Sequence, residues 1–74
     1  MEIFRLRPDD EFIKLGQLLK AAGAAESGVD AKEMIQDGIV SVNGETETRR
    51  GIKLYAGDVA SCDGREIKIE KEQE

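Results

Sequence analysis

The sequence predicts an α+β fold in which two short helices pack on one face of a small, mostly antiparallel sheet. Three features indicate this fold. Apolar residues recur at helical spacing over residues 15–22. A β-branched run then ends in Asn43-Gly44, the strongest two-residue hairpin signal. A second such pair, Asp63-Gly64, precedes a segment at residues 65–70 in which apolar and charged residues alternate.

The N-terminal segment predicts an edge strand. Residues 2–7 alternate, so that Phe4 and Leu6 share one face while Arg5 and Arg7 point to solvent. Pro8-Asp9-Asp10 then predicts a turn, and the residues after it lead into the first helix.

The two helices follow one another closely. The first begins near Leu15, and Gly23 stands just past its apolar stripe, where a left-handed C-cap favours glycine. The second covers residues 28–37, with Ser27 as its N-cap and Gly38 as the glycine that ends it. Because helices of this length are not stable alone in water, they need a sheet to pack on.

The rest of the chain supplies that sheet. Short alternating or β-branched segments predict strands at residues 39–42, 45–48, 52–54, 59–62 and 65–70. Cys62 falls in one of these strands and is interpreted as a small core residue. We expect one domain over residues 1–70, followed by a frayed acidic tail at residues 71–74.

Composition argues against catalysis. The chain has 74 residues, which is one small domain with a thin core. It contains no His, so the commonest general base and metal ligand is missing, and Ser27 has no His to activate it. The single Cys62 excludes an internal disulfide and a multi-cysteine zinc site. We therefore expect a cytoplasmic protein that is not an enzyme and holds no cofactor or metal.

The acidic charge lies at the two ends of the chain. The net charge is −5, yet residues 12–57 carry six basic and six acidic side chains. The excess of acid belongs to residues 1–11 and 58–74. A basic surface over the helices and the first hairpin is therefore compatible with the composition.

The middle of the chain resembles the S-four (S4) RNA-binding domain, or alpha-L motif. Residues at the family's spacing match its pattern, namely Lys14-Leu15-Gly16, Leu19, Gly23, Ser27-Gly28, Ala31-Lys32, Ile35, Gly38, Val40, Val42-Asn43-Gly44 and Gly57-Asp58. The whole chain is similar to the stand-alone bacterial members, the YbcJ-like proteins. Two positions depart from the pattern: Gly16 replaces the family's usual Asp, and Gly28 replaces a basic residue of many members.

The resemblance implies a function. It implies a non-enzymatic protein that recognises structured RNA, either ribosomal RNA or a ribosome-assembly intermediate, through a basic surface of helices and hairpin. The candidate RNA-binding residues are Lys14, Lys20, Lys32, Arg49, Arg50 and Lys53. It further implies a monomer with a ribosome-associated protein as a possible partner and no membrane contact. The alternative is a protein-binding adaptor that uses the same surface or the acidic ends.

The candidate residues also have a simpler interpretation. The lysines are then ordinary solvated side chains, and the arginines pair with Glu45, Glu47 or Asp58 in weak surface ion pairs.

If the surface binds RNA, the two arginines are not equivalent, because alternation along a strand sends Arg49 and Arg50 to opposite faces. Only one of the two is then expected to contact RNA fully, unless Gly51 bends the chain.

Overall fold

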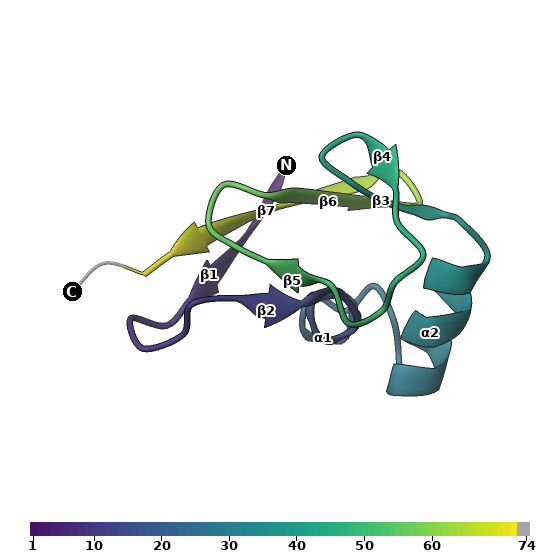
Figure 1. Cartoon of the computed structure of the whole chain (residues 1–74), viewed down its shortest axis with the longest axis horizontal. Coiled ribbons are helices and arrows are strands. Elements are labelled where there is room, and N and C mark those ends of the chain that lie inside the picture. Colours follow the sequence, from purple (N-terminus) through teal and green to yellow (C-terminus); the bar gives the residue numbers. More distant parts are fainter. Residues whose placement is uncertain (73–74) are drawn as a thin grey trace.

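The predicted α+β fold is confirmed by a computed structural model, which describes residues 1–72 of the chain. Figure 1 shows α1 and α2 on one side of a five-stranded sheet, with β2 and β5 forming a separate two-stranded ribbon beside α1. The elements in chain order are β1 (Glu2–Leu6), β2 (Ile13–Lys14), α1 (Leu15–Ala21), α2 (Gly28–Gln36), β3 (Val40–Val42), β4 (Glu45–Thr46), β5 (Lys53–Leu54), β6 (Val59–Cys62) and β7 (Arg65–Lys71).

The sheet has the strand order β1-β7-β6-β3-β4. Two tight hairpins build it, and both have positive φ at their two central residues: 52° and 86° at Asn43-Gly44, 49° and 82° at Asp63-Gly64. Such values are those of the type I′ turn that fits the twist of the flanking strands. The predicted edge strand β1 closes the sheet by pairing in parallel with β7. The first and last strands of the chain therefore lie side by side in one sheet.

Both helices begin where the sequence predicts, and α2 ends at Gln36, one residue before the predicted end. The Ser27 side chain accepts a hydrogen bond of 3.1 Å from the backbone N–H of Asp30, and so caps α2. The Asp30 carboxylate in turn accepts a bond of 3.0 Å from the N–H of Glu26, which fixes the entry into the helix. Gly23 and Gly38 follow the two helices in the left-handed region, at φ values of 75° and 78°.

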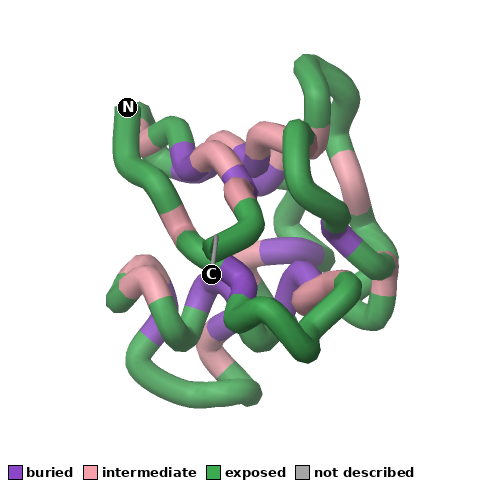
Figure 2. The backbone as a smooth tube through the Cα atoms, turned by 90° about the vertical axis from the view of Figure 1, so that its left-hand side faces the viewer, coloured by how far each residue is buried: buried purple, intermediate pink, exposed green. Residues whose placement is uncertain are grey.

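One core joins the helices to the sheet. Figure 2 shows that both layers contain buried positions. The core is made of Leu6, Leu15, Leu18, Leu19, Ala25, Ala31, Ile35, Val40, Leu54, Ala60, Cys62, Ile67 and Ile69. Cys62 is 3% exposed, as expected for a core residue, and burial raises the pKa of its thiol. Among residues 1–72, no helix is long and apolar enough to cross a membrane.

Apart from one-residue shifts at the ends of some elements, the structure differs from the sequence interpretation in three places. Residues 13 and 14 form β2, which pairs with β5, whereas this segment was expected only to lead into the helix. The return strand β4 ends at Thr46, short of the predicted residue 48, although the N–H of Glu47 still donates to Val40. Strand β7 continues to Lys71, one residue into the expected tail, because β1 pairs along its whole end, and the N–H of Glu72 donates to the carbonyl of Leu6. Residues 73 and 74 of the expected tail lie outside the described part.

Candidate nucleic-acid interface

An open groove lies between α1, the start of α2 and the loop that precedes β5. We call it the basic groove, and it is lined by Lys14, Gly16, Gln17, Lys20, Gly28, Arg50 and Gly51. Three of these seven residues are cationic and none is acidic. An anion that enters this groove therefore meets positive charge from two directions, from α1 and from the loop.

Backbone hydrogen bonds hold the loop of the basic groove against the first turn of α1. The N–H of Leu15 donates to the carbonyl of Ile52 at 3.0 Å, and the N–H of Gly16 donates to the carbonyl of Arg50 at 3.1 Å. The first N–H groups of a helix have no partner inside the helix, so these bonds satisfy two of them. The loop is thereby fixed relative to α1, and Arg50 is fixed with it.

Gly16 lets Arg50 lie close to α1. A Cβ atom on Gly16 would lie 2.9 Å from Cγ of Arg50, which is closer than real Cβ contacts allow. The absence of that atom makes room for the aliphatic stem of the arginine. Gly28, on the other side of the basic groove, has no atom within 4 Å of its hypothetical Cβ. The two glycines therefore act differently. Gly16 allows the side chain of Arg50 to pack against α1, and Gly28 leaves its side of the groove open.

A pair of opposed lysines adjoins the basic groove. Lys14 of β2 and Lys53 of β5 are direct partners in the antiparallel ribbon, and both are exposed. Like charges directly opposite each other destabilise a strand pair. An anion between them removes that repulsion, so this pair favours binding of a negatively charged group. Since Lys14 also lines the basic groove, the positive surface is continuous from the groove to the ribbon.

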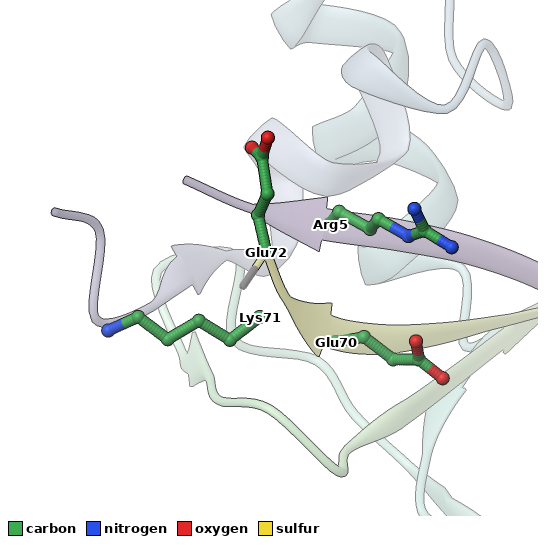
Figure 3. A pocket seen from close by; sticks show the side chains of 4 residues that line it. All are labelled: Arg5, Glu70, Lys71 and Glu72. Atoms are coloured by element: carbon green, nitrogen blue, oxygen red, sulfur yellow. The ribbon is translucent and has the colours of Figure 1, made fainter. Parts of the chain in front are cut away.

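Another hollow has a different character. It lies at the paired ends of β1 and β7, where Figure 3 shows its four lining side chains, Arg5, Glu70, Lys71 and Glu72. Arg5 and Glu70 are cross-strand partners in the sheet. Two cations and two carboxylates are interspersed here, so this hollow does not attract an anion as the basic groove does.

Comparison with known proteins decides the family. Residues 6–70 match the family model described as the S4 domain. The chain belongs to the S4 domain family. The resemblance found in the sequence is thus confirmed, together with the alpha-L fold that it implied.

The relatives of this S4 domain include two curated bacterial proteins. The probable ribosome maturation protein RlbA of Bacillus subtilis is 48% identical over 56 residues, which are 76% of this chain and 79% of that protein. The putative RNA-binding protein YbcJ of Escherichia coli is 40% identical over 57 residues, which are 77% and 81% of the two chains. The solution structure of Escherichia coli YbcJ, described as revealing an alpha-L motif involved in RNA binding, superimposes with a TM-score of 0.72 at 37% identity. That match covers 95% of this chain and 87% of YbcJ.

The S4 domain brings four of the six candidate residues together. Lys14, Lys20 and Arg50 line the basic groove, and Lys53 stands opposite Lys14 on the ribbon. Lys32 is exposed on α2 and does not line the basic groove. It lies one helical turn after a groove residue, Gly28, and so on the same face of the helix.

Arg49 points into an ion pair instead. Its guanidinium donates to both carboxylate oxygens of Glu47, at 3.0 and 3.1 Å, and its backbone N–H donates to the same carboxylate at 3.0 Å. The Arg49 side-chain bond, helped by the backbone bond, lowers the pKa of Glu47 to about 2. Arg49 thus forms the ion pair with Glu47 that the simpler interpretation describes, while Arg50 lines the basic groove of the S4 domain. Strand alternation had predicted that the two arginines would separate.

Two features of the S4 domain site escaped the sequence interpretation. One is the contact between Gly16 and Arg50, because the glycine was noted only as a departure from the family's Asp. The other is the pair of aromatic residues next to the opposed lysines, with the Phe12 and Tyr55 ring centroids 6.0 Å apart. Residues 12–14 are Phe-Ile-Lys and residues 53–55 are Lys-Leu-Tyr, and nothing in these two short runs indicates that they pair.

Proposed function

We propose that this protein binds structured RNA through the basic groove and the adjoining pair of lysines, and that it acts as a binding module without catalysing a reaction. The observation that carries the proposal is the basic groove itself, with three cations and no acidic side chain in its lining. Phosphate contacts from Lys and Arg supply a large share of the affinity of proteins for nucleic acids. The relatives support the choice of RNA, since YbcJ is described as a putative RNA-binding protein.

We further propose that the RNA is ribosomal RNA or a ribosome-assembly intermediate. The support is the likeness to RlbA, described as a probable ribosome maturation protein. The same proposal places the protein in the cytoplasm with the ribosome, as a monomer that also meets a ribosome-associated protein. Crosslinking in cells followed by sequencing of the bound RNA tests this step. Recovery of messenger or transfer RNA in place of ribosomal RNA would contradict it, even if the basic groove binds RNA.

The geometry favours recognition of RNA shape and backbone. The four basic residues of the groove and the adjoining lysine pair come from α1, the loop and the ribbon. Backbone hydrogen bonds hold these three segments in one arrangement. Cations on a fixed frame suit phosphates whose spacing is fixed by a folded RNA. Each phosphate neutralised by a cation adds about 0.7–0.9 to the slope of affinity against salt on a logarithmic scale. Contacts from all four residues then predict a slope of about −3.

A protein-binding adaptor is the alternative. The mixed charges of the hollow shown in Figure 3 favour it, because interspersed charges of both signs suit a protein partner better than a polyanion. This hollow lies at the ends of β1 and β7, and the basic groove lies between the helices and the loop. An adaptor that binds through this hollow uses a different surface from the basic groove, and variants of each surface separate it from RNA binding.

The experiment compares charge removal at the two surfaces. One variant carries Lys20→Gln and Arg50→Gln in the basic groove, and the matched control carries Arg5→Gln and Lys71→Gln in the hollow, which also removes two exposed cations. Binding of labelled RNA hairpins is followed by fluorescence anisotropy over a range of salt concentrations. The groove variant is expected to lose about tenfold or more in affinity and to reduce the salt slope by about 1.5. The control is expected to retain both.

Two results would contradict the proposal. Equal binding by the folded groove variant and the parent would show that the basic groove does not contact RNA. Equal losses in the groove variant and the control would show that net charge alone governs binding. Circular dichroism verifies that both variants are folded, which is expected because all four side chains are exposed.

A further inference from the structure

The two-stranded ribbon places four side chains on one surface. Ile13 pairs with Leu54 and Lys14 pairs with Lys53, and Leu54 is fully buried while Ile13 packs partly against the core. Side chains alternate along a strand, so the residues next to this buried pair point away from the core. We call this surface the outer ribbon face, and it consists of Phe12, Lys14, Lys53 and Tyr55. It carries two of the three aromatic residues of the chain.

The aromatic half of the outer ribbon face is accessible. Tyr55 is 49% exposed, and its ring lies 6.0 Å from that of Phe12 with a tilt of 54° between the planes. The ammonium group of Lys53 lies 4.8 Å from the centre of the Phe12 ring. A cation over an aromatic face is a favourable contact, and it covers part of Phe12. Tyr55 is thus the ring of this pair that is more open to a planar ligand.

Hydrogen bonds fix the backbone that carries Tyr55. Its N–H donates to the Asp58 carboxylate at 2.8 Å, and the N–H of Asp58 donates back to the carbonyl of Tyr55 at 3.0 Å. The same carboxylate accepts a bond of 3.1 Å from the side chain of Asn43 in the first hairpin, and Asn43 also accepts from the N–H of Val59. The turn is thereby tied to the five-stranded sheet. A ligand that stacks on Tyr55 therefore meets a backbone that is already in place.

We propose that the outer ribbon face binds an unpaired nucleobase of RNA, which stacks on Tyr55 while the neighbouring phosphates contact Lys14 and Lys53. This inference rests on the RNA binding proposed above and adds the class of RNA: a folded RNA with a bulged or unpaired nucleotide beside its helix. Unpaired bases in RNA are commonly recognised by stacking on aromatic side chains. The opposed lysines supply the charge that a nucleotide backbone needs. Since Lys14 also lines the basic groove, the helix and the unpaired nucleotide bind one continuous surface.

The test uses two RNA hairpins that differ by one nucleotide. One contains a single bulged 2-aminopurine, a fluorescent adenine analogue, and the other is fully paired. Anisotropy measures the affinity of each, and the fluorescence of the 2-aminopurine reports stacking directly. The parent protein is expected to bind the bulged hairpin about tenfold more tightly and to quench its fluorescence.

Substitutions at Tyr55 then assign the contact. Tyr55→Phe keeps the aromatic ring and is expected to keep both the preference and the quenching. Tyr55→Leu keeps an apolar side chain against Phe12, and is expected to lose the preference while binding the paired hairpin as the parent does. Ile39→Ala is the matched control, because Ile39 is 50% exposed and lies outside this face. It is expected to behave as the parent.

The outcomes separate this inference from the function on which it rests. If the parent binds both hairpins equally without quenching, or if Tyr55→Leu keeps the preference, the stacking site is overturned and groove binding stands. If the parent binds neither hairpin at low salt, both proposals are overturned. Quenching is measured with the parent protein, so this part of the test remains valid even if substitutions at Tyr55 destabilise the fold.

Discussion

Replacement of Gly16 by Ala is expected to weaken RNA binding without lowering the stability of the fold. The new Cβ would lie 2.9 Å from Cγ, 3.5 Å from Cδ and 3.6 Å from the carbonyl oxygen of Arg50. The closest atom belongs to the stem of an exposed arginine, which can rotate away, and the backbone carbonyl is at ordinary contact distance. Gly16 is helical, and alanine is more favourable than glycine inside a helix by about 1 kcal/mol. We therefore expect Gly16→Ala to leave the free energy of unfolding unchanged or to raise it by up to about 1 kcal/mol.

The same substitution is expected to weaken RNA binding. The Arg50 side chain must leave its seat against α1, so the basic groove loses one of its three cations. Loss of one phosphate contact corresponds to about fivefold in affinity, or about 1 kcal/mol, and lowers the salt slope by about 0.7–0.9. Gly16→Asp moves Arg50 in the same way and adds a carboxylate beside the groove. Its affinity is expected to be lower still.

The assay combines urea unfolding with anisotropy over a range of salt concentrations. Gly28→Ala is the matched control, since it places a methyl group in the same basic groove with no atom within 4 Å and leaves Arg50 in place. It is expected to change affinity little. If folded Gly16→Ala binds RNA as the parent does, with the same salt slope, the packing of Arg50 against Gly16 has no role in binding. If it unfolds more easily by over 2 kcal/mol, the stem of Arg50 cannot rotate away as argued.

Three further predictions concern the fold. Ser27→Ala removes the cap of α2 and is expected to lower the free energy of unfolding by about 1 kcal/mol in urea titrations; an unchanged value would show that the Asp30 side chain suffices. Leu18→Ala opens a cavity at a fully buried position and is expected to cost about 3 kcal/mol, whereas Val29→Ala, at an exposed apolar position, is expected to cost far less. The pKa of Glu47 is lowered from 4.5 to about 2 by Arg49, so its stabilising contribution is complete above pH 4.5 and is lost as the pH falls towards 2. The stability difference between the parent and Glu47→Gln is therefore expected to shrink over that range, and a constant difference would refute the assignment.

The parts of the fold that could be predicted depend on local signals. Asn43-Gly44 and Asp63-Gly64 turn the chain because glycine and asparagine or aspartate tolerate positive φ, whatever the rest of the protein does. Ser27 caps a helix through a bond to a residue three positions later. The apolar stripe of α1 depends on spacing within two turns. Each of these signals lies within a few residues of the structure that it specifies, so the sequence alone was enough.

The parts that could not be predicted depend on contacts between distant segments. The ribbon joins residues 13 and 14 to residues 53 and 54. A strand at residues 52–54 is predicted from its alternation, but residues 13 and 14 are too few for a recognisable pattern, and no local signal indicates that the two segments pair. The pairing brings residues 50–55 beside residues 12–16, and so places Arg50 against Gly16 and the Phe12 ring near that of Tyr55. The choice between the two arginines needed the structure as well, because it depends on the bonds that tie Arg49 to Glu47. The candidate site was thus predicted as a set of basic residues, but its arrangement was not.

The net charge of −5 is compatible with a basic groove because of where the ion pairs form. Two ion pairs occur among residues 1–72, Arg49 with Glu47 and Arg65 with Glu2, and both use arginines outside the basic groove. The hydrogen bond from Arg65 lowers the pKa of Glu2. The cations of the groove keep their charge available for a ligand. At physiological salt the field of distant acids is screened within about 8 Å, so an RNA in the groove experiences the local cations more than the total charge. The acidic ends then oppose nonspecific binding elsewhere on the surface, and they favour RNA whose phosphates fit the groove.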